Sequence, residues 1–264
     1  MQEFKPSKEH SIAKEAIMGA GKIALKWFQN DPKSWTKDDG TQVSEADIEI
    51  NDYLSEKINK KLKKIGWLSE ENHDDYSRLK FSKVFLIDPI DGTKSFLEGK
   101  EDFSISVALI EKGRPISALI LNPVYNELFE AELNKGSWMN SIRIRVSNNK
   151  NLEGSRMCAF KPMFSHPAWK EPWPKMVIKN KNSIAYRMAL VAMGKFDVMM
   201  ALNPKNDWDI AAGDLLVTEA GGEVTDHLGE KMTYNKKEIK KKSVVGGCKD
   251  IHLKIIERVK GLPL

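Results

Sequence analysis

Apolar residues recur every three or four positions in two segments near the start of the chain. Within residues 8–28 the positions from Ile12 to Trp27 follow this spacing, which predicts an amphipathic helix. The polar segment WTKDDGTQ follows and is rich in turn-forming residues, so we expect an exposed, mobile loop there. A second helix is predicted from Ser44, because SEAD has the S-x-x-D/E form of a capping box and apolar positions recur after it.

The pattern changes at Val84 to short β-like runs. The runs VFLID, FSISVALIE, ISALILN and ELFEAEL are bounded by Gly, Pro or Asn, and they predict a mostly antiparallel sheet. Residues 150–182 show no clear period. After them, SIAYRMALVAM and DIAAGDLLVTEA favour helices on either side of a strand, FDVMMAL, and such alternation is typical of an α/β arrangement. We therefore predict an N-terminal α+β half over 1–146 and a C-terminal α/β half over 147–264.

Composition excludes several classes of protein. The 264 residues are 41% hydrophobic and 30% charged, which is ordinary for a globular protein and excludes disorder. The net charge of +5 is small for a dedicated nucleic-acid binder. Cys158 and Cys248 are too few for a disulfide framework, so we expect reduced thiols and a cytoplasmic protein. Because no apolar run is long enough to span a bilayer, and because MQEFKPSKEHS lacks a signal peptide's apolar stretch, we expect no membrane partner.

Acidic residues occur in four short clusters that suggest chemistry: Asp47; Glu70 and Glu71; Asp88 and Asp91; and Asp209. DPIDGT follows an apolar run, so Asp88 is expected at the end of a strand, where Pro89 turns the chain and lets Asp91 converge on the same point. Two converging carboxylates repel unless a cation lies between them. Oxygen ligands favour Mg²⁺, Mn²⁺ or Ca²⁺ over zinc. The amides of Gly92 and Thr93 follow the turn and are candidates to hold a phosphate oxygen.

Each acid also has a purely structural explanation. Asp47 suits the capping box of its helix, and Asp209 suits the first turn of another helix. Glu70 and Glu71 belong to a residue type that is mostly exposed, and DPIDG has the composition of a tight turn. None of these explanations accounts for all four clusters in one chain.

Taken together, WLSEEN, LIDPIDGTKSF and DWDIAAGDLLVTEAGG resemble the three sequence blocks of the inositol monophosphatase superfamily, in order and at suitable separations. The similarity extends from VSEAD to EAGGEVTD. This resemblance implies a five-layered α-β-α-β-α sandwich and Mg²⁺-dependent hydrolysis of a small phosphorylated metabolite. It also implies two or three metal ions, with Mn²⁺ as a substitute, inhibition by lithium and a homodimer.

The resemblance further implies roles for individual positions. The metal ligands would be Glu70, Asp88, Asp91, Asp209 and the carbonyl group of Ile90. Asp47 and Thr93 would orient and deprotonate the attacking water, and Lys37 would lie in a mobile loop that carries ligands for an additional metal. The candidate substrate contacts are Gly92, Thr93, Ser183, Ala185 and Lys205. Since phosphoryl transfer depends on positioning and charge, no nucleophilic side chain is required.

The substrate stays open at this point. Inositol-specific members carry a glutamate seven positions before the aspartate of WD, where this chain has Leu202. ALNPKNDWD instead resembles bacterial 3′(2′),5′-bisphosphate nucleotidases, although TKDDGTQVSEAD also resembles histidinol-phosphate phosphatases. We favour a bisphosphate nucleotidase over an inositol-1-monophosphatase or a histidinol-phosphate phosphatase. Lys205 and Arg187 are candidates to contact a second phosphate, whereas Trp208 is expected to pack and orient Asp209.

Other classes of function fit the sequence less well. The segments INKKLKKIG and KKEIKKK leave open a nucleic-acid or protein-binding protein with a basic surface. No aromatic residues interleave with these lysines, so we expect no nucleic-acid partner. A catalytically silent relative is disfavoured because every expected ligand position carries its acid. GAGKIA at Gly19 matches a loose dinucleotide fingerprint, but it lies within a predicted helix that no strand precedes.

Overall fold

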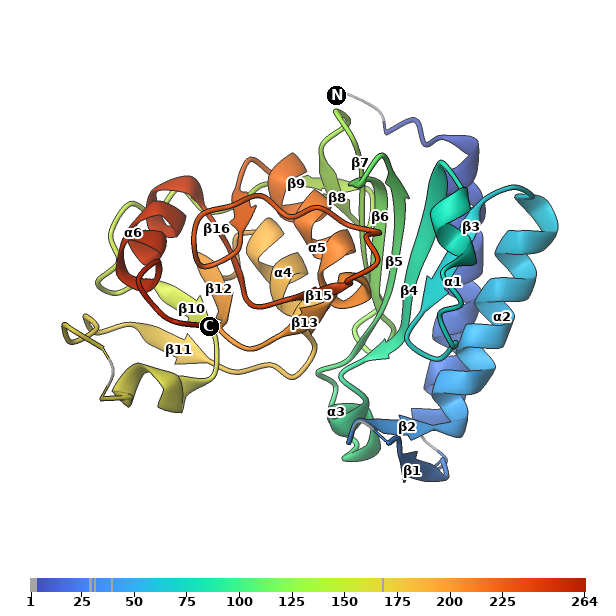
Figure 1. The fold of residues 1–264 in the computed structure, drawn as a ribbon, viewed down its shortest axis with the longest axis horizontal. Coiled ribbons are helices and arrows are strands. Elements are labelled where there is room, and N and C mark those ends of the chain that lie inside the picture. Colours follow the sequence, from blue (N-terminus) through green and yellow to red (C-terminus); the bar gives the residue numbers. More distant parts are fainter. Residues whose placement is uncertain (1–3, 29, 31, 39, 168) are drawn as a thin grey trace.

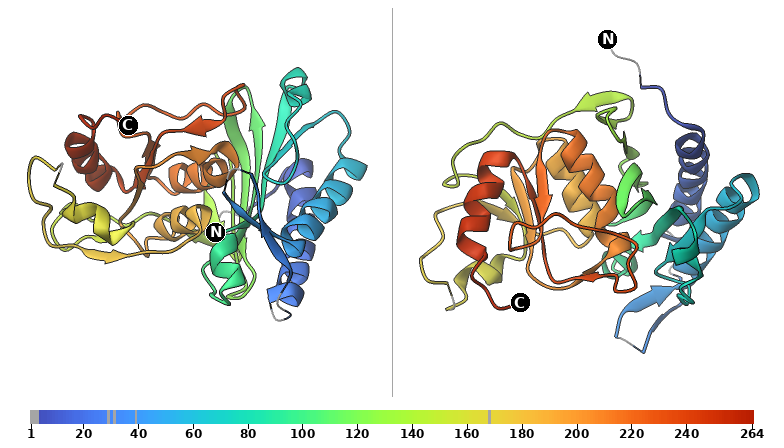
Figure 2. Two further views of the ribbon diagram at one scale, coloured as in Figure 1. Left: turned by 60° about the horizontal axis from the view of Figure 1, so that its bottom comes forward. Right: turned by 45° about the horizontal axis from the view of Figure 1, so that its top comes forward.

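The computed structural model describes residues 4–28, 30, 32–38, 40–167 and 169–264. Helices and strands stack in five layers, in the order α-β-α-β-α (Figure 1). Both views of Figure 2 show the first two helices, in blue, at one end of the stack and the last helix, in red, at the other. The five-layered sandwich implied by the sequence blocks is therefore confirmed.

The larger sheet has seven strands in the order β3-β4-β5-β6-β7-β8-β9. Their bounds are Gly66–Ser69, Lys83–Asp91, Ser104–Glu111, Arg114–Asn122, Glu127–Glu132, Ser137–Met139 and Ile142–Ile144. Only β3 and β4 pair in parallel, and the remaining neighbours pair antiparallel, as the sequence predicts.

Helices cover both faces of this sheet. α1 (Lys8–Phe28) and α2 (Glu45–Lys61) pack on one face, and α4 (Ile184–Ala192) and α5 (Asp207–Glu219) pack on the other. Each face of the sheet is covered by its own hydrophobic core, and successive residues of β4 point to opposite faces. Phe85 packs in the core under α1 and α2, and Leu86 packs in the core under α4 and α5. Because both faces are buried, β4 reads VFLI without polar interruptions.

A second, mixed sheet of five strands lies beyond α4 and α5, in the order β11-β10-β12-β16-β14. The bounds of these strands in chain order are Arg156–Cys158 (β10), Val177–Lys179 (β11), Val198–Ala201 (β12), Glu223–Thr225 (β14) and Val244–Gly247 (β16). Alternate residues of β12 face opposite sides, with Met199 toward α4 and α5 and Met200 toward α6 (Lys249–Val259). This sheet and its helices agree with the mixed α/β fold class expected for the chain, while the division into two halves at Val146 stays a prediction.

Several short elements lie around the sandwich. They are β1 (Ser34–Thr36), β2 (Gln42–Ser44), the 3₁₀-helices η1 (Ser77–Lys80) and η2 (Lys161–Ser165), α3 (Thr93–Leu97), β13 (Lys205–Asn206) and β15 (Lys240–Lys241). β1 and β2 form an antiparallel hairpin, so Trp35, Thr36 and Gln42, at the two ends of the segment predicted as a loop, lie in paired strands. The sequence missed this hairpin because both of its strands are only three residues long. In the described part of the chain, no helix has the length and apolar character needed to cross a bilayer.

Candidate active site

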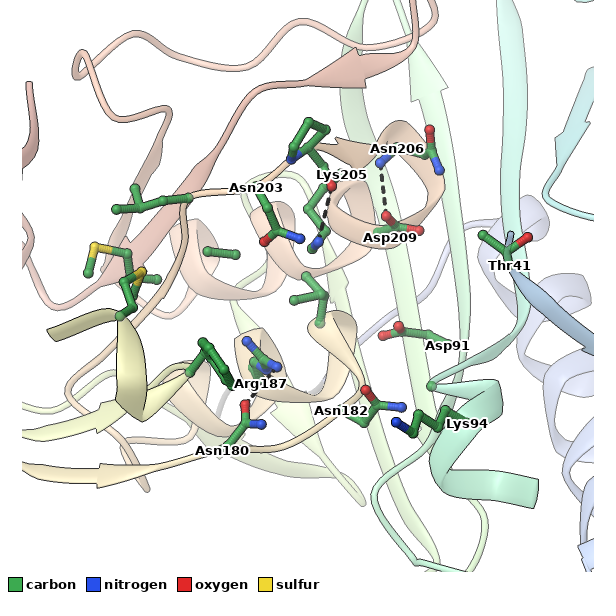
Figure 3. Close-up of a pocket in the computed structure, with 18 of the residues that line it drawn as sticks. Thr41, Asp91, Lys94, Asn180, Asn182, Arg187, Asn203, Lys205, Asn206 and Asp209 are labelled. Atoms are coloured by element: carbon green, nitrogen blue, oxygen red, sulfur yellow. Dashed lines mark hydrogen bonds between the residues drawn. The ribbon is translucent and has the colours of Figure 1, made fainter. Parts of the chain in front are cut away.

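A cleft of about 1380 Å³ opens between the two sheets, where the carboxyl end of β4 meets the amino ends of α4 and α5. The β1–β2 hairpin and α3 line one side of the cleft, and the other side is lined by β12, β13 and the residues Phe160, Met163, His166 and Trp169. Residues that lie more than a hundred positions apart in the sequence therefore face the same space. Figure 3 shows Asp91 and Asp209 on one side of this space and Arg187 and Asn180 on the other.

The DPIDGT segment forms the floor of the cleft, but its geometry differs from the expected turn at Pro89. β4 continues through Pro89 to Asp91, and its register against β5 shifts between Asp88 and Asp91. Because proline has no N–H to donate, a bulge accommodates it within the strand. The chain turns only at Gly92, whose φ is 98°. A Cβ atom there would lie 3.0 Å from the Asp102 carbonyl oxygen, so the position requires glycine.

Three acids meet above this floor. Glu70, Asp88 and Asp209, here called the acid cluster, offer carboxylate oxygens that all lie within 4.8 Å of one another. Burial raises the pKa of Asp88 well above its ordinary value, and the charges of Glu70 and Asp91 add to the effect. Burial likewise raises the pKa of Glu70 to about 8 and that of Asp209 to about 7. At neutral pH these carboxylates must therefore bind either protons or a cation.

Asp88 provides the most direct test of whether a metal ion fits. Its side chain is 2% exposed, and its Oδ1 atom has no hydrogen-bond partner. A buried carboxylate oxygen without a partner carries a large desolvation penalty. An oxygen-coordinated cation supplies the missing partner, and Mg²⁺ prefers carboxylate ligands of this kind. The residues present therefore fit a hard divalent metal ion.

Asp91 lies beside the acid cluster but is held by the start of α4. Its Oδ2 atom accepts hydrogen bonds from the Ser183 hydroxyl at 2.5 Å and from the Ala185 amide at 2.6 Å. Asp91 and Asp209 both line the cleft, as Figure 3 shows, and the charge of Asp91 raises the pKa of Asp209. Ser183 and Ala185 thus orient a carboxylate, and their predicted contact with substrate stays a prediction.

Asp47 joins the helix α2 to the site. Its Oδ2 atom accepts from the Ser44 amide at 2.8 Å and from the Ser44 hydroxyl at 2.6 Å, which completes the capping box. Its other oxygen, Oδ1, lies 3.2 Å from the Thr93 hydroxyl, which also lies 3.0 Å from the carbonyl oxygen of Ile90. Burial raises the pKa of Asp47 to about 6, although the Ser44 hydrogen bonds oppose the shift. The helix cap and the contact with Thr93 therefore coexist in one side chain.

Lys37 reaches the acids from the β1–β2 hairpin. Its ammonium group lies 2.7 Å from Glu71 Oε1 and 3.7 Å from Glu70 Oε1. Burial disfavours the charge on Lys37, but the hydrogen bond to Glu71 and the charge of Glu70 outweigh burial and raise its pKa. The sequence left the role of Glu71 open, and the structure assigns it to binding this lysine beside the acid cluster.

The remaining candidates lie at the start of α5. Asp209 is the third residue of the helix and accepts from the Asn206 amide at 2.8 Å, so it also completes a capping box. Trp208 packs partly buried against the central core, as predicted. Lys205 lines the cleft, and its ammonium group donates to the Pro204 carbonyl oxygen at 3.0 Å. In the basic segment KKEIKKK, Lys241 forms an ion pair with buried Asp207 and is thus part of the fold.

Sequence reasoning missed one part of the cleft. Phe160, Met163 and Trp169 line its far side, and all three belong to the stretch that showed no periodicity. This stretch holds η2 and β11, both too short to produce a period. The stretch is rich in aromatic residues, including Phe164 and Trp173, which pack against each other. This composition is the feature of the sequence that could have predicted a packed apolar surface here.

Comparison with known proteins agrees with the geometry. Residues 5–261 match the model of the inositol monophosphatase family. The chain is 28% identical over 229 residues to the 3′(2′),5′-bisphosphate nucleotidase CysQ of Haemophilus influenzae, covering 83% of this chain and 84% of that protein. It is 31% identical over 230 residues to an inositol-1-monophosphatase of Rhizobium meliloti, covering 83% and 85%. The crystal structure of the extragenic suppressor protein suhB from Bartonella henselae superimposes with a TM-score of 0.82 at 28% identity, covering 97% of this chain and 99% of that one. The chain therefore belongs to the inositol monophosphatase family.

Proposed function

We propose that this protein is a Mg²⁺-dependent phosphomonoesterase that hydrolyses a small phosphorylated metabolite by attack of an activated water molecule. The observation that carries the proposal is the unpartnered oxygen of Asp88, which lies buried within the acid cluster at the floor of an open cleft. Family membership supports the reaction class, because the family is named for a phosphatase activity.

The acid cluster, together with Asp91 and the Ile90 carbonyl group, would hold the metal ions. When bound, Mg²⁺ neutralises the phosphate oxygens, lowers the pKa of water and stabilises the leaving alkoxide. The chain's own residues position the water: the Thr93 hydroxyl lies between Asp47 and the Ile90 carbonyl group, so it can orient a water molecule and pass its proton to Asp47. The amides of Gly92 and Thr93, at the start of α3, would receive a phosphate oxygen.

For the substrate, we favour a 3′(2′),5′-bisphosphate nucleotide over inositol 1-phosphate or histidinol phosphate. Leu202 lines the cleft where inositol-specific members carry a glutamate, so an inositol hydroxyl group would meet an apolar side chain. A desolvated hydroxyl group without a partner weakens binding. Two named relatives, a nucleotidase and an inositol phosphatase, match at similar identity, so local chemistry has to decide between them.

The test is phosphate release from these three substrates and fructose 1,6-bisphosphate at near-neutral pH. Each is measured with Mg²⁺, with Mn²⁺, with chelator and with added Li⁺. We expect release that requires the metal, is inhibited by Li⁺ and is fastest for the bisphosphate nucleotide. Absence of release from every substrate by folded protein with Mg²⁺ would exclude the phosphatase, whereas faster release from another substrate would exclude only the nucleotidase. Sedimentation would test the homodimer implied by family resemblance.

A further inference from the structure

Arg187 carries a buried charge, and the carboxylates whose charges act on it, those of Asp91 and Asp102, lie beyond ion-pair distance. The residue is 8% exposed and lines the cleft one turn into α4. Its Nε atom donates to the Lys181 carbonyl oxygen at 2.5 Å, and its Nη2 atom donates to Asn180 Oδ1 at 2.9 Å. Among the described residues, no carboxylate lies within salt-bridge distance of the guanidinium group. A buried guanidinium group is costly unless an anion balances it, and this one faces a cavity that an anion can enter.

Lys205 brings a second cation to the same space. It lines the cleft half-buried, and Figure 3 shows its ammonium group pointing into the space that Asp209 and Arg187 border. Burial lowers the pKa of Lys205; the charge of Asp209 opposes this and the charge of Arg187 adds to it. Both cations line the same cleft, and their like charges repel each other. An anion bound between them would relieve the repulsion.

An apolar wall lies beyond Arg187, formed by Phe160, Met163, Trp169 and Leu202. Phe160 is 58% exposed although it borders a cavity. Trp169 is fixed by a hydrogen bond from its Nε1 atom to the Met163 carbonyl oxygen at 2.7 Å, and its ring packs edge-on against Trp173. An aromatic and thioether surface of this kind suits the face of a planar ring.

We propose that Arg187 and Lys205 bind a second phosphate group of the substrate, and that the apolar wall contacts its base, so that the substrate is a nucleoside bisphosphate. This inference rests on the phosphatase function proposed above. Water adds to the phosphorus atom held at the acid cluster, the P–O ester bond breaks, and the ribose oxygen leaves as a hydroxyl group with a proton. The second phosphate stays intact on the product. Arginine suits this role because its planar fork matches two phosphate oxygens at once.

The decisive comparison uses two substrates that differ only in the second phosphate: 3′-phosphoadenosine 5′-phosphate and adenosine 3′-phosphate. We expect the wild-type kcat/KM to be at least about 10-fold higher for the bisphosphate. In Arg187→Gln, the ratio of the two kcat/KM values should fall by roughly 10- to 100-fold, the range for loss of a hydrogen bond to a charged group. Arg114→Gln removes an exposed arginine on β6 and should leave the ratio as in the wild type.

A binding measurement separates recognition from catalysis. Adenosine 5′-phosphate carries only the second phosphate, and titration calorimetry with chelator present measures its Kd without turnover. We expect the Kd to rise at least about 10-fold in Arg187→Gln and less in Arg187→Lys, which keeps the charge but loses the fork. Thermal unfolding of each variant reports whether the contacts with Lys181 and Asn180 are needed for folding.

The outcomes are distinguishable. Equal losses for both substrates in Arg187→Gln, or a wild type indifferent to the second phosphate, would overturn the subsite while leaving the phosphatase intact. Absence of Mg²⁺-dependent release from either substrate would overturn the phosphatase function and the subsite with it. A lower ratio together with weaker binding of adenosine 5′-phosphate, in a variant that unfolds at the wild-type temperature, would establish the subsite.

Discussion

Glu70 offers a quantitative test of the acid cluster, because its charge should destabilise the folded protein whenever no metal ion is bound. Burial raises the pKa of Glu70 from 4.5 to about 8; Lys37 opposes this shift, and the charge of Asp209 adds to it. Since the pKa is raised on folding, both states are protonated below pH 4.5 and no penalty arises there. Above that pH the unfolded chain releases the proton and the folded protein keeps it, so the free energy of unfolding falls by 1.36 kcal/mol for each pH unit. The loss is about 3 kcal/mol at pH 7.

Glu70→Gln keeps the shape of the side chain and removes its ionisation. In chelator at pH 7 we expect this variant to be more stable than the wild type by about 3 kcal/mol, or about 5 °C in Tm for a chain of this length. At pH 5 the gain should fall below about 1 kcal/mol. Saturating Mg²⁺ should stabilise the wild type far more than the variant, because a metal ion that binds only the folded state shifts the unfolding equilibrium.

The assay is thermal unfolding followed by circular dichroism at pH 5 and pH 7, with chelator and with Mg²⁺. Glu56→Gln is the matched control, since Glu56 lies on α2 with its side chain 62% exposed. This substitution should leave the Tm unchanged at both pH values. The reasoning is refuted if Glu70→Gln is no more stable than the wild type in chelator at pH 7. It is equally refuted if the gain persists unchanged at pH 5, because a packing effect would not depend on ionisation.

Three further predictions concern other parts of the chain. Asp88→Asn should lower kcat/KM by at least about 100-fold and reduce the Mg²⁺-induced rise in Tm, since a metal ligand contributes several kcal/mol; wild-type activity would contradict the ligand assignment. Gly92→Ala should lower the free energy of unfolding by about 2 kcal/mol, because φ is 98° and a Cβ atom meets the Asp102 carbonyl oxygen at 3.0 Å; unchanged urea unfolding would contradict this. Burial raises the pKa of Asp197, but hydrogen bonds from Arg156 outweigh burial and lower the pKa to about 2. The ionised carboxylate therefore stabilises the folded protein above pH 3.8, and this stabilisation is lost as the pH falls through 2. Asp197→Asn should therefore lose about 1 to 2 kcal/mol at pH 7, discounted because Arg156 is 44% exposed, and the loss should vanish near pH 2 in urea titrations.

Local patterns in the sequence determined the long elements. The period of apolar residues in 8–28 predicted α1 to its last residue, and SEAD predicted the cap of α2 at Ser44. These features follow from the sequence because their physical cause is local: one face of a helix must be buried, and the first amides of a helix need an acceptor. The order of the sequence blocks also indicated the family.

Only the tertiary structure decided what the chemical groups contact. The sequence placed Asp88 beside a turn, but the bulge that carries it depends on pairing with β5, which is a separate segment of the chain. The pairing of Lys37 with Glu71 and the position of Arg187 beside the cleft likewise depend on segments that fold together from distant positions. The energy of a buried charge is set by its surroundings in space, and a residue's neighbours along the chain supply few of them.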